Sequence, residues 1–332
     1  MSPESRKPPS ITDPPPPQVR EDLAILRAAL DETIPPRIVD RNLLIATWNL
    51  RAFASVTKKW QAGEDDSPKR DYQSVLAIAE IISRFDVAAL QEVKGNLRAL
   101  RYLLKVLGPQ WGLLLTDVSR GHKGNAERMA FVFDLRRVTP SGLAAELVVP
   151  EEWRERIGPD ALREQFARTP YAVSFRAKGR TFILVTLHVR YGSTQAERLP
   201  EIRAIAEWMG DWARQINAWH HNLIVLGDFN IDRRGDALYD AFVSTGLTVP
   251  PGLHNVPRTL FSDPKHPDLS QFYDQIAWFT GKGNTPALSL PYLTAGHFDF
   301  SRTALQSQAL SRQALSWRIS DHYPLWVAFS LR

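Results

Sequence analysis

Two nearly continuous apolar runs, residues 181–189 and 223–226, constrain the fold of this chain more than any other feature. Runs rich in β-branched residues with so few polar positions are typical of strands that are covered on both faces. The segment between them, residues 196–219, carries apolar side chains at helical spacing, namely Leu199, Ile202, Ile205, Ala206, Met209, Trp212 and Ile216. Two buried strands joined by a long helix predict a layered α/β architecture.

The same alternation of strands and helices continues through the rest of the chain. We expect further strands at residues 43–47, 87–91, 111–116, 129–133 and 325–329, and helices at residues 74–84 and 97–107. In the first of these helices, Val75, Ile78, Ala79 and Ile82 share one face. No internal repeat interrupts the pattern, so residues 39–332 are expected to form one domain.

The first 38 residues differ from this domain in composition. They contain Pro8, Pro9 and a run of prolines at residues 14–17, which cannot donate backbone hydrogen bonds and which favour extended geometry. Residues 18–30 then place apolar side chains at helical spacing. We therefore expect residues 1–38 to form a mobile, solvated proline-rich tail followed by a short helix that packs against the domain.

Polar side chains stand at the ends of several expected strands. They are Asn49, Glu92, Asp228 with Asn230, and Asp321 with His322. Asp228 and Asn230 are two residues apart, so in extended geometry both side chains project to one side. Each motif alone is equally consistent with a turn or a cap, because Asp and Asn readily bond their own backbone. Together they predict a site for a divalent metal and a phosphate ester at one edge of a sheet.

The composition limits the chemistry of this site. The chain has no cysteine, which excludes disulfides, a thiolate nucleophile and zinc–thiolate ligation. A metal must then be held by oxygen or imidazole, and oxygen ligands favour Mg²⁺ or Mn²⁺, with Ca²⁺ also possible, over zinc. The net charge of +5 favours an anionic partner without requiring one.

The chain also carries features that bear on its location. No apolar stretch approaches the roughly 18 residues of a membrane span. The N-terminus lacks the apolar core of a signal peptide. Together with the absence of cysteine, these features predict a reducing, cytoplasmic setting by default, and we expect a monomer without a membrane span.

Seven short segments occur in a fixed order along the chain: IATWNLRAF at 45–53, FDVAALQEVK at 85–94, ERMAFVF at 127–133, LH at 187–188, LGDFN at 226–230, YDQI at 273–276 and ISDHYP at 319–324. With these segments the chain resembles the endonuclease/exonuclease/phosphatase superfamily, and within it the deoxyribonuclease I-like nucleases. The resemblance implies a four-layered α/β sandwich. Two mixed β-sheets pack face to face in such a sandwich and are flanked by helices, with the site at one end.

The resemblance implies a metal site and a nucleophile site. By position in these segments, Glu92 resembles the principal Mg²⁺ ligand, assisted by Asn49 and Asp321. Asp228 and Asn230 resemble the pair that orients the attacking water and contacts the scissile phosphate.

The resemblance also implies two histidine–carboxylate pairs. His322 with Asp274 resembles the first pair, and His188 with Glu127 resembles the second, which is typical of the deoxyribonuclease I-like nucleases. Such pairs serve as general base and general acid near neutral pH, and the sequence leaves open which histidine plays which part. Arg168 matches an arginine that binds phosphate.

Arg51 and Lys94 fall where these nucleases reach into the minor groove, so both are candidate DNA contacts. The function that the resemblance implies is a divalent-metal-dependent DNA endonuclease. Two alternatives stay open. Sphingomyelinases share the SDHYP segment, which leaves a phospholipid or a small phosphate ester as a possible substrate, and the remaining alternative is an inactive binding module.

The chain departs from the secreted deoxyribonucleases, which depend on a disulfide, so their extracellular setting does not transfer. Residues 250–270, rich in proline and histidine, are expected to form a long loop that either faces the substrate or is a solvated insertion. His220 and His221 are expected to cap the long helix, and Trp60 is expected to be partly buried.

Overall fold

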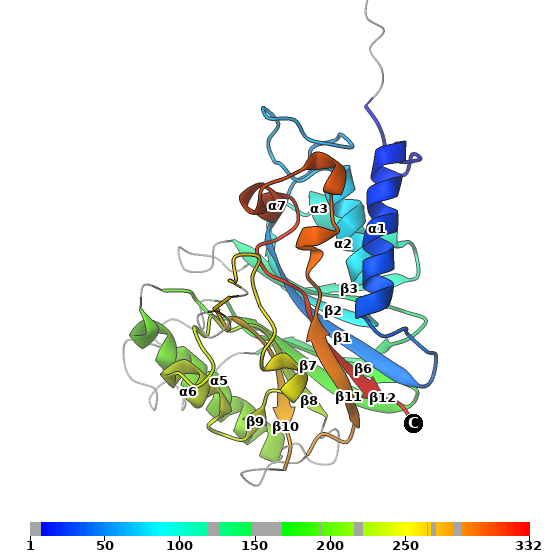
Figure 1. The fold of residues 1–332 in the computed structure, drawn as a ribbon. Coiled ribbons are helices and arrows are strands. Elements are labelled where there is room, and N and C mark those ends of the chain that lie inside the picture. Colours follow the sequence, from blue (N-terminus) through cyan, green and yellow to red (C-terminus); the bar gives the residue numbers. More distant parts are fainter. Residues whose placement is uncertain are drawn as a thin grey trace, which may run out of the picture.

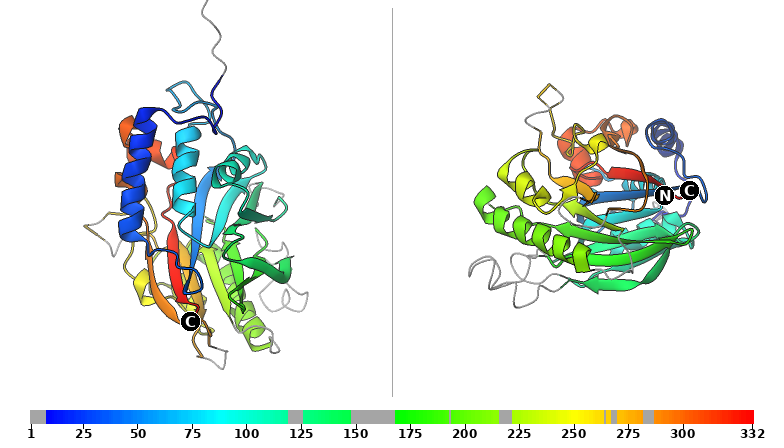
Figure 2. Two further views of the ribbon diagram at one scale, coloured as in Figure 1. Left: turned by 90° about the vertical axis from the view of Figure 1, so that its right-hand side faces the viewer. Right: turned by 90° about the horizontal axis from the view of Figure 1, so that it is seen from below.

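The computed structural model describes residues 8–118, 126–147, 168–192, 194–215, 222–263, 265–266, 270–281 and 287–332. Within them, two six-stranded sheets pack face to face, and helices cover their outer surfaces (Figure 1). Helices α1 (Pro17–Thr33), α2 (Tyr72–Ile82), α3 (Arg98–Leu107) and α7 (Arg312–Arg318) lie outside one sheet. Helices α5 (Gln195–Gln215) and α6 (Ala237–Val243) lie outside the other (Figure 2). The expected four-layered α/β sandwich is confirmed.

The first sheet has the strand order β11-β12-β1-β2-β4-β3. Its strands are β1 (Asn42–Phe53), β2 (Val87–Lys94), β3 (Trp111–Leu115), β4 (Glu127–Asp134), β11 (Tyr292–His297) and β12 (Leu325–Ser330). β1 and β2 run parallel, whereas the other neighbours are antiparallel, so the sheet is mixed. β1 and β2 extend past the expected strands through irregular pairing and thereby include Asn49 and Glu92.

The second sheet has the strand order β5-β6-β7-β8-β10-β9. Its strands are β5 (Thr139–Glu146), β6 (Tyr171–Ala177), β7 (Arg180–His188), β8 (Leu223–Asp228), β9 (Leu247–Thr248) and β10 (Asp274–Phe279). β7 and β8 are joined by α5, as the two apolar runs and the segment between them predicted, and the two strands run parallel. Antiparallel pairs complete this second mixed sheet.

Both faces of the central strands are buried, because each sheet contacts the other sheet on one face and helices on the opposite face. In β1, Leu43 and Ile45 belong to the core between the sheets. The alternate residues Leu44 and Ala46 belong to the core beneath α1, α2 and α3. This double burial explains why the central strands have apolar sequences without alternation.

The N-terminal helix packs against the domain as predicted, with Val19, Leu23, Leu26 and Leu30 buried. The expectation of a solvated tail before this helix is wrong at Ile11, which is buried in the same core. Its isolated position among prolines and polar residues gave no periodic signal. No helix of the described residues is long and apolar enough to cross a membrane.

Several elements were not predicted from the sequence: β5, β6, β9, β10, β11, α6, α7 and the 3₁₀ turns η1 (Pro251–Leu253), η4 (Phe300–Arg302) and η5 (Gln306–Gln308). β5 and β11 are edge strands with largely exposed or half-buried residues, so they lack the apolar pattern of the central strands. The described part of α5 ends at Gln215. The rest of the expected long helix and the proposed caps His220 and His221 lie outside the described residues.

The register of the strands brings polar groups to one end of the sandwich. His188, the last residue of β7, is paired with Asp228, the last residue of β8. Asp228 is paired in turn with Asp274, the first residue of β10. In the other sheet, the end of β1 lies beside the start of β12, so the segment that precedes β12 reaches the same end. Sheet pairing therefore positions side chains that are far apart in the sequence.

Gly227 makes the close pairing of β7 and β8 possible. Its φ of +142° lies in a region that residues with a Cβ rarely adopt. A Cβ on Gly227 would also lie 2.1 Å from the backbone oxygen of Leu187. The residue that precedes Asp228 must therefore be glycine for this geometry.

We expect Gly227→Ala to destabilise the domain by more than the ~1–3 kcal/mol of backbone strain alone, because β7 and β8 must also separate. Urea unfolding followed by circular dichroism measures the change. Gly63→Ala is the matched control, since the nearest contact of its Cβ would be Oδ2 of Asp66 at 3.6 Å. Equal stability of the two variants would contradict the argument from close strand pairing.

Candidate active site

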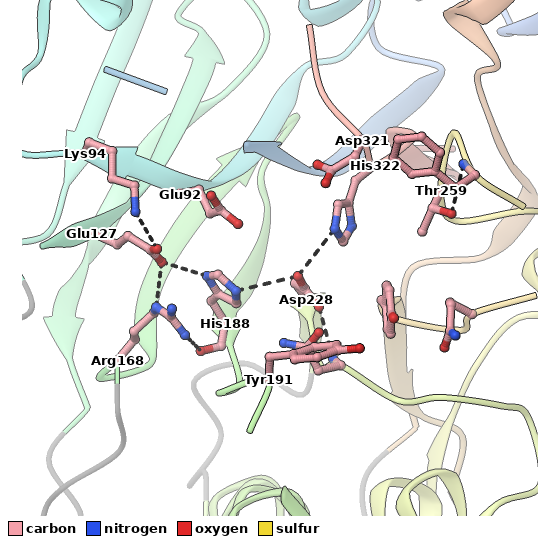
Figure 3. A pocket seen from close by; sticks show the side chains of 14 residues that line it. Glu92, Lys94, Glu127, Arg168, His188, Tyr191, Asp228, Thr259, Asp321 and His322 are labelled. Carbon is pink, nitrogen blue, oxygen red and sulfur yellow. Dashed lines mark hydrogen bonds and ion pairs between the residues drawn. The ribbon is translucent and has the colours of Figure 1, made fainter. Parts of the chain in front are cut away.

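A cavity of about 470 Å³ opens at the end of the sandwich where β1, β2, β7 and β8 finish (Figure 3). Nine of the predicted site residues line it: Glu92, Lys94, Glu127, Arg168, His188, Asp228, Asn230, Asp321 and His322. The others, Asn49, Asp274 and Arg51, contact lining residues from behind. The structure thus brings together every residue that the sequence proposed, while their roles remain predictions.

Glu127, at the start of β4, is the centre of one buried cluster. Its Oε2 lies 3.0 Å from Nδ1 of His188 and 2.6 Å from Nε of Arg168. Its Oε1 accepts a hydrogen bond from Nζ of Lys94 at 2.7 Å. Burial opposes ionisation of Glu127, but the hydrogen bond with His188 and the charges of His188 and Arg168 lower the pKa of its carboxyl to about 2. The carboxylate therefore stays ionised and holds the ring of His188.

His322 and Asp274 form the second histidine–carboxylate pair, with 2.6 Å between Nδ1 and Oδ2. Burial raises the pKa of Asp274 to about 6, although the charge of His322 opposes this. Burial also disfavours protonated His322, but the charge of Asp274 and the hydrogen bond with it raise the pKa of His322 to about 10. Near neutral pH this is an imidazolium–carboxylate pair.

Asp228 lies between the two pairs, as Figure 3 shows. Its Oδ2 is 3.6 Å from Nε2 of His188 and 3.9 Å from Nε2 of His322. The same oxygen accepts a hydrogen bond from Nδ2 of Asn49 at 3.0 Å. Two imidazoles, each oriented by its own carboxylate, thus face one central carboxylate, which places a possible general base and a possible general acid in one cavity.

Glu92 enters the cavity from the irregular end of β2. Its φ of +58° is unusual for a residue with a side chain and indicates a constrained position. Its Oε1 accepts a hydrogen bond from Nδ2 of Asn49 at 3.1 Å, and its Oε2 accepts one from the backbone of Ala52 at 2.8 Å. Asn49 therefore links Glu92 to Asp228 across the two sheets.

The chemistry of the lining suits a hard divalent cation. Ligand atoms of Glu92, Glu127 and His188 lie within 4.8 Å of one another. The carboxylates that line the cavity are Glu92, Glu127, Asp228 and Asp321, whereas its basic side chains are Lys94, Arg168 and the histidines. A phosphate ester would meet an excess of carboxylate oxygen here unless a cation were bound, and oxygen ligands are those that Mg²⁺, Mn²⁺ and Ca²⁺ prefer.

Asn230 and Arg168 hold the cavity wall as well as line it. The side chain of Asn230 donates from Nδ2 to the backbone oxygen of Val189 at 2.7 Å. The backbone amide of Asn230 donates to Oδ1 of Asp228 at 3.0 Å. Arg168 is only 7% exposed and donates from Nη1 to the backbone oxygen of His188 at 3.4 Å. The two side chains thus hold the backbone of Val189 and His188 at the edge of the cavity.

The two candidate DNA contacts are engaged with site carboxylates. Lys94 is bound to Glu127, as described above. Nη1 of Arg51 lies 3.2 Å from Oδ2 of Asp321 and donates to Oγ of Ser316 at 2.6 Å. The guanidinium of Arg51 also stacks 3.9 Å from the ring centre of Trp317, which is 46% exposed. The structure places Arg51 and Lys94 inside the site network, not on an outer surface.

Arg258 is a structural support that sequence reasoning missed. It is fully buried and donates to the backbone oxygens of Asp274, Val256 and Leu253 at 2.9, 2.6 and 2.7 Å. Its own backbone oxygen accepts a hydrogen bond from the amide of Tyr323 at 2.8 Å. One residue therefore ties β10 to the segment that carries His322. Its partners are backbone atoms, so no sequence motif could have revealed it.

Glu201 of α5 is a second missed residue near the site. It accepts a hydrogen bond from the backbone of Arg190. Burial raises the pKa of its carboxyl to about 7, although that hydrogen bond and the charges of Arg168 and His188 oppose the shift. Helix α5 thus carries a titratable group that interacts electrostatically with His188.

The remaining sequence expectations concern loops. Thr259 and Phe261, from the long loop at residues 250–270, line the cavity, and Thr259 forms a bridge with His322. The loop therefore faces the cavity, one of the two expected possibilities. Trp60 is partly buried as expected and packs edge-on against Tyr72, with ring centres 5.7 Å apart.

Comparison with known proteins gives a consistent result. Residues 46–322 match the model of the endonuclease/exonuclease/phosphatase family. A protein of Thioalkalivibrio sp. (strain K90mix) named deoxyribonuclease is 26% identical over 296 residues, which cover 87% of this chain and 71% of that protein.

Solved structures share the fold at low sequence identity. The mannosyl-6-phosphatase Bt3783 of Bacteroides thetaiotaomicron matches with a TM-score of 0.55 and 20% identity, over 86% of this chain and 98% of that one. The catalytic domain of human nocturnin matches with a TM-score of 0.54 and 17% identity, over 88% and 94% of the two chains. D. rerio TDP2 in complex with a single-stranded DNA product matches with a TM-score of 0.54 and 15% identity, over 87% and 98%.

We expect Arg258→Lys to destabilise the domain by about 3–5 kcal/mol, because a buried ammonium cannot reach three separate carbonyl oxygens. The pairing of His322 with Asp274 should loosen at the same time. Thermal unfolding and an NMR titration of the His322 ring measure the two effects. Arg41→Lys, at an exposed position, is the control. Unchanged stability and an unchanged His322 titration in Arg258→Lys would contradict this supporting role.

Proposed function

The chain belongs to the endonuclease/exonuclease/phosphatase family, and from this premise we propose that it is a divalent-metal-dependent endonuclease that hydrolyses phosphodiester bonds in DNA. It is an enzyme that acts on ester bonds. The observation that carries the proposal is the second histidine–carboxylate pair, His188 with Glu127, which faces Asp228 opposite the pair of His322 with Asp274. The similarity to a protein named deoxyribonuclease supports the same substrate.

Glu92 and Asp321 would hold the cation, assisted by Asn49, which contacts Glu92 from outside the cavity lining. All three carry oxygen atoms, and for this reason we propose Mg²⁺, with Mn²⁺ as a functional replacement. When bound, the cation supplies positive charge to the phosphate and to the leaving oxygen. Arg51, through its ion pair at 3.2 Å, fixes the carboxylate of Asp321.

The two histidines and Asp228 supply the proton transfers. Water attacks phosphorus in line with the leaving oxygen, so a P–O bond forms while the P–O bond to the sugar breaks. We assign the water to the side of Asp228 and His188, where Glu127 stabilises an imidazole that gains the proton. His322 already carries a proton near neutral pH because its pKa is raised to about 10, and it donates to the departing alkoxide.

A small phosphate ester is the alternative substrate. The fold is shared with a mannosyl-6-phosphatase, and the cavity of about 470 Å³ is large enough for a sugar phosphate. The two substrates differ in their response to salt. Binding of a polyanion releases counterions, so activity on DNA falls steeply with salt concentration, whereas activity on a small ester changes little.

We expect the wild-type enzyme to nick supercoiled plasmid in Mg²⁺ or Mn²⁺ and to lose this activity in excess chelator. His322→Ala and Asp228→Ala should each lower the rate by about 10²–10⁴-fold, because each removes a proton-transfer group. Agarose electrophoresis of the plasmid measures both effects.

The control is His266→Ala, which removes an exposed loop imidazole and should leave nicking unchanged. Equal activity of His322→Ala and the control would remove the proposed site. Nicking that survives the chelator would exclude the metal-dependent mechanism.

A second prediction separates positioning from DNA contact. Since Arg51 and Lys94 are bound to site carboxylates, Arg51→Ala and Lys94→Ala should each lower turnover of plasmid and of a small chromogenic phosphodiester by similar factors. Initial rates on both substrates give the comparison. Loss on plasmid alone would show that these two side chains leave their carboxylates and contact the DNA.

A further inference from the structure

A second cavity, of about 830 Å³, lies on the other side of one wall of the active-site cavity. Gln271 lines both cavities. Elsewhere in the wall, consecutive residues line opposite cavities. Phe261, Tyr273 and His322 line the active-site cavity, whereas their neighbours Ser262, Phe272 and Tyr323 line the second cavity. Consecutive Cα atoms are only ~3.8 Å apart, so the wall is about one residue thick.

The second cavity has an excess of positive charge. Arg233 and Arg234 reach it from the segment after β8, and Arg302 and Arg312 reach it from η4 and the start of α7. The acidic residues in its lining are Asp263 and Asp299. Oδ1 of Asp299 is already used, since it accepts a hydrogen bond from the backbone of Ser301 at 2.9 Å. We call this space the arginine cavity.

Within the described part of the chain, the guanidinium groups of the four arginines form no hydrogen bond or ion pair. Arginines at the opposite end of the sandwich differ in this respect. Arg37 and Arg136 lie 3.0 and 2.6 Å from Oδ2 of Asp134, and Arg137 lies 2.8 Å from Asp86. Those residues stabilise the fold, whereas the arginines of the arginine cavity remain available to a ligand.

The chemistry of the arginine cavity fits phosphate. Guanidinium groups bind phosphate through paired, charge-assisted hydrogen bonds. A nucleic-acid strand carries one phosphate per ~3.4 Å of helix axis, so a strand with one phosphate in the active site presents others close by. A small phosphate ester has no second phosphate to offer.

We propose that the arginine cavity binds a non-scissile phosphate of the same nucleic-acid strand that the active site cleaves. This inference rests on the proposed function. It gives the arginine cavity a contact with DNA outside the active site, where Arg51 and Lys94 are bound to site carboxylates. The enzyme then prefers polymeric over monomeric substrates because two neighbouring cavities hold one strand.

The test compares two double variants with equal loss of charge. Arg302→Ala with Arg312→Ala removes half of the cationic lining of the arginine cavity. Arg41→Ala with Arg176→Ala removes two exposed arginines at the far end of the sandwich and is the control. Rates are measured on a short labelled duplex and on bis(4-nitrophenyl) phosphate over a range of salt concentrations.

The first variant should raise KM for the duplex about tenfold and reduce the slope of log KM against log salt by up to about 1, since the loss of one phosphate contact contributes ~0.9. Its kcat and its rate on the small ester should match those of the control. Arg302→Lys with Arg312→Lys keeps both charges and should restore most of the salt slope.

Three results would overturn the inference. One is a duplex KM of the alanine variant that equals that of the control, and another is a loss of activity on both substrates together, which would indicate a disturbed active site. If the wild type cleaves the duplex in either case, the proposed function stands and only the arginine cavity loses its assigned ligand. If the wild type cleaves the small ester but no duplex, the proposed function and this inference fail together.

Discussion

The site depends on one buried carboxylate. Asp228 is 2% exposed and lies between two imidazoles at 3.6 and 3.9 Å, with the amide of Asn49 donating to it at 3.0 Å. A buried carboxylate without partners is strongly destabilising, so these neighbours offset the cost of burying Asp228. The two imidazoles are held in turn by the carboxylates of Glu127 and Asp274.

Strand register places the residues of the site next to one another. His188, Asp228 and Asp274 are directly paired across three adjacent strands, so the distances among them follow from backbone hydrogen bonding. A shift of one residue in this register would turn each side chain to the opposite face of the sheet. The glycine at position 227, which allows β7 and β8 to approach closely, is therefore a requirement of the chemistry as much as of the sheet.

The sequence could predict those parts of the molecule whose role is visible in the type and spacing of their side chains. The central strands have apolar runs because both their faces are buried, and the polar residues at their ends carry ionisable side chains. Arg258 could not be found in this way, since it binds backbone oxygens and lies in a loop without periodicity. The edge strand β5 was missed because its residues are exposed or half-buried. Ile11 was missed because one buried side chain forms no pattern.

Arg51 shows what residue type alone leaves open. An arginine near a phosphate site has the same charge whether it contacts DNA or holds a ligand, and only its partners separate the two roles. Here those partners are Asp321 and the ring of Trp317. The net charge of +5 does not locate a binding surface either, because an arginine that is paired with a carboxylate, such as Arg137 with Asp86 at the far end of the sandwich, presents little charge to a substrate. The position of unpaired cations beside the active site, not their total number, is what favours a polyanion as substrate.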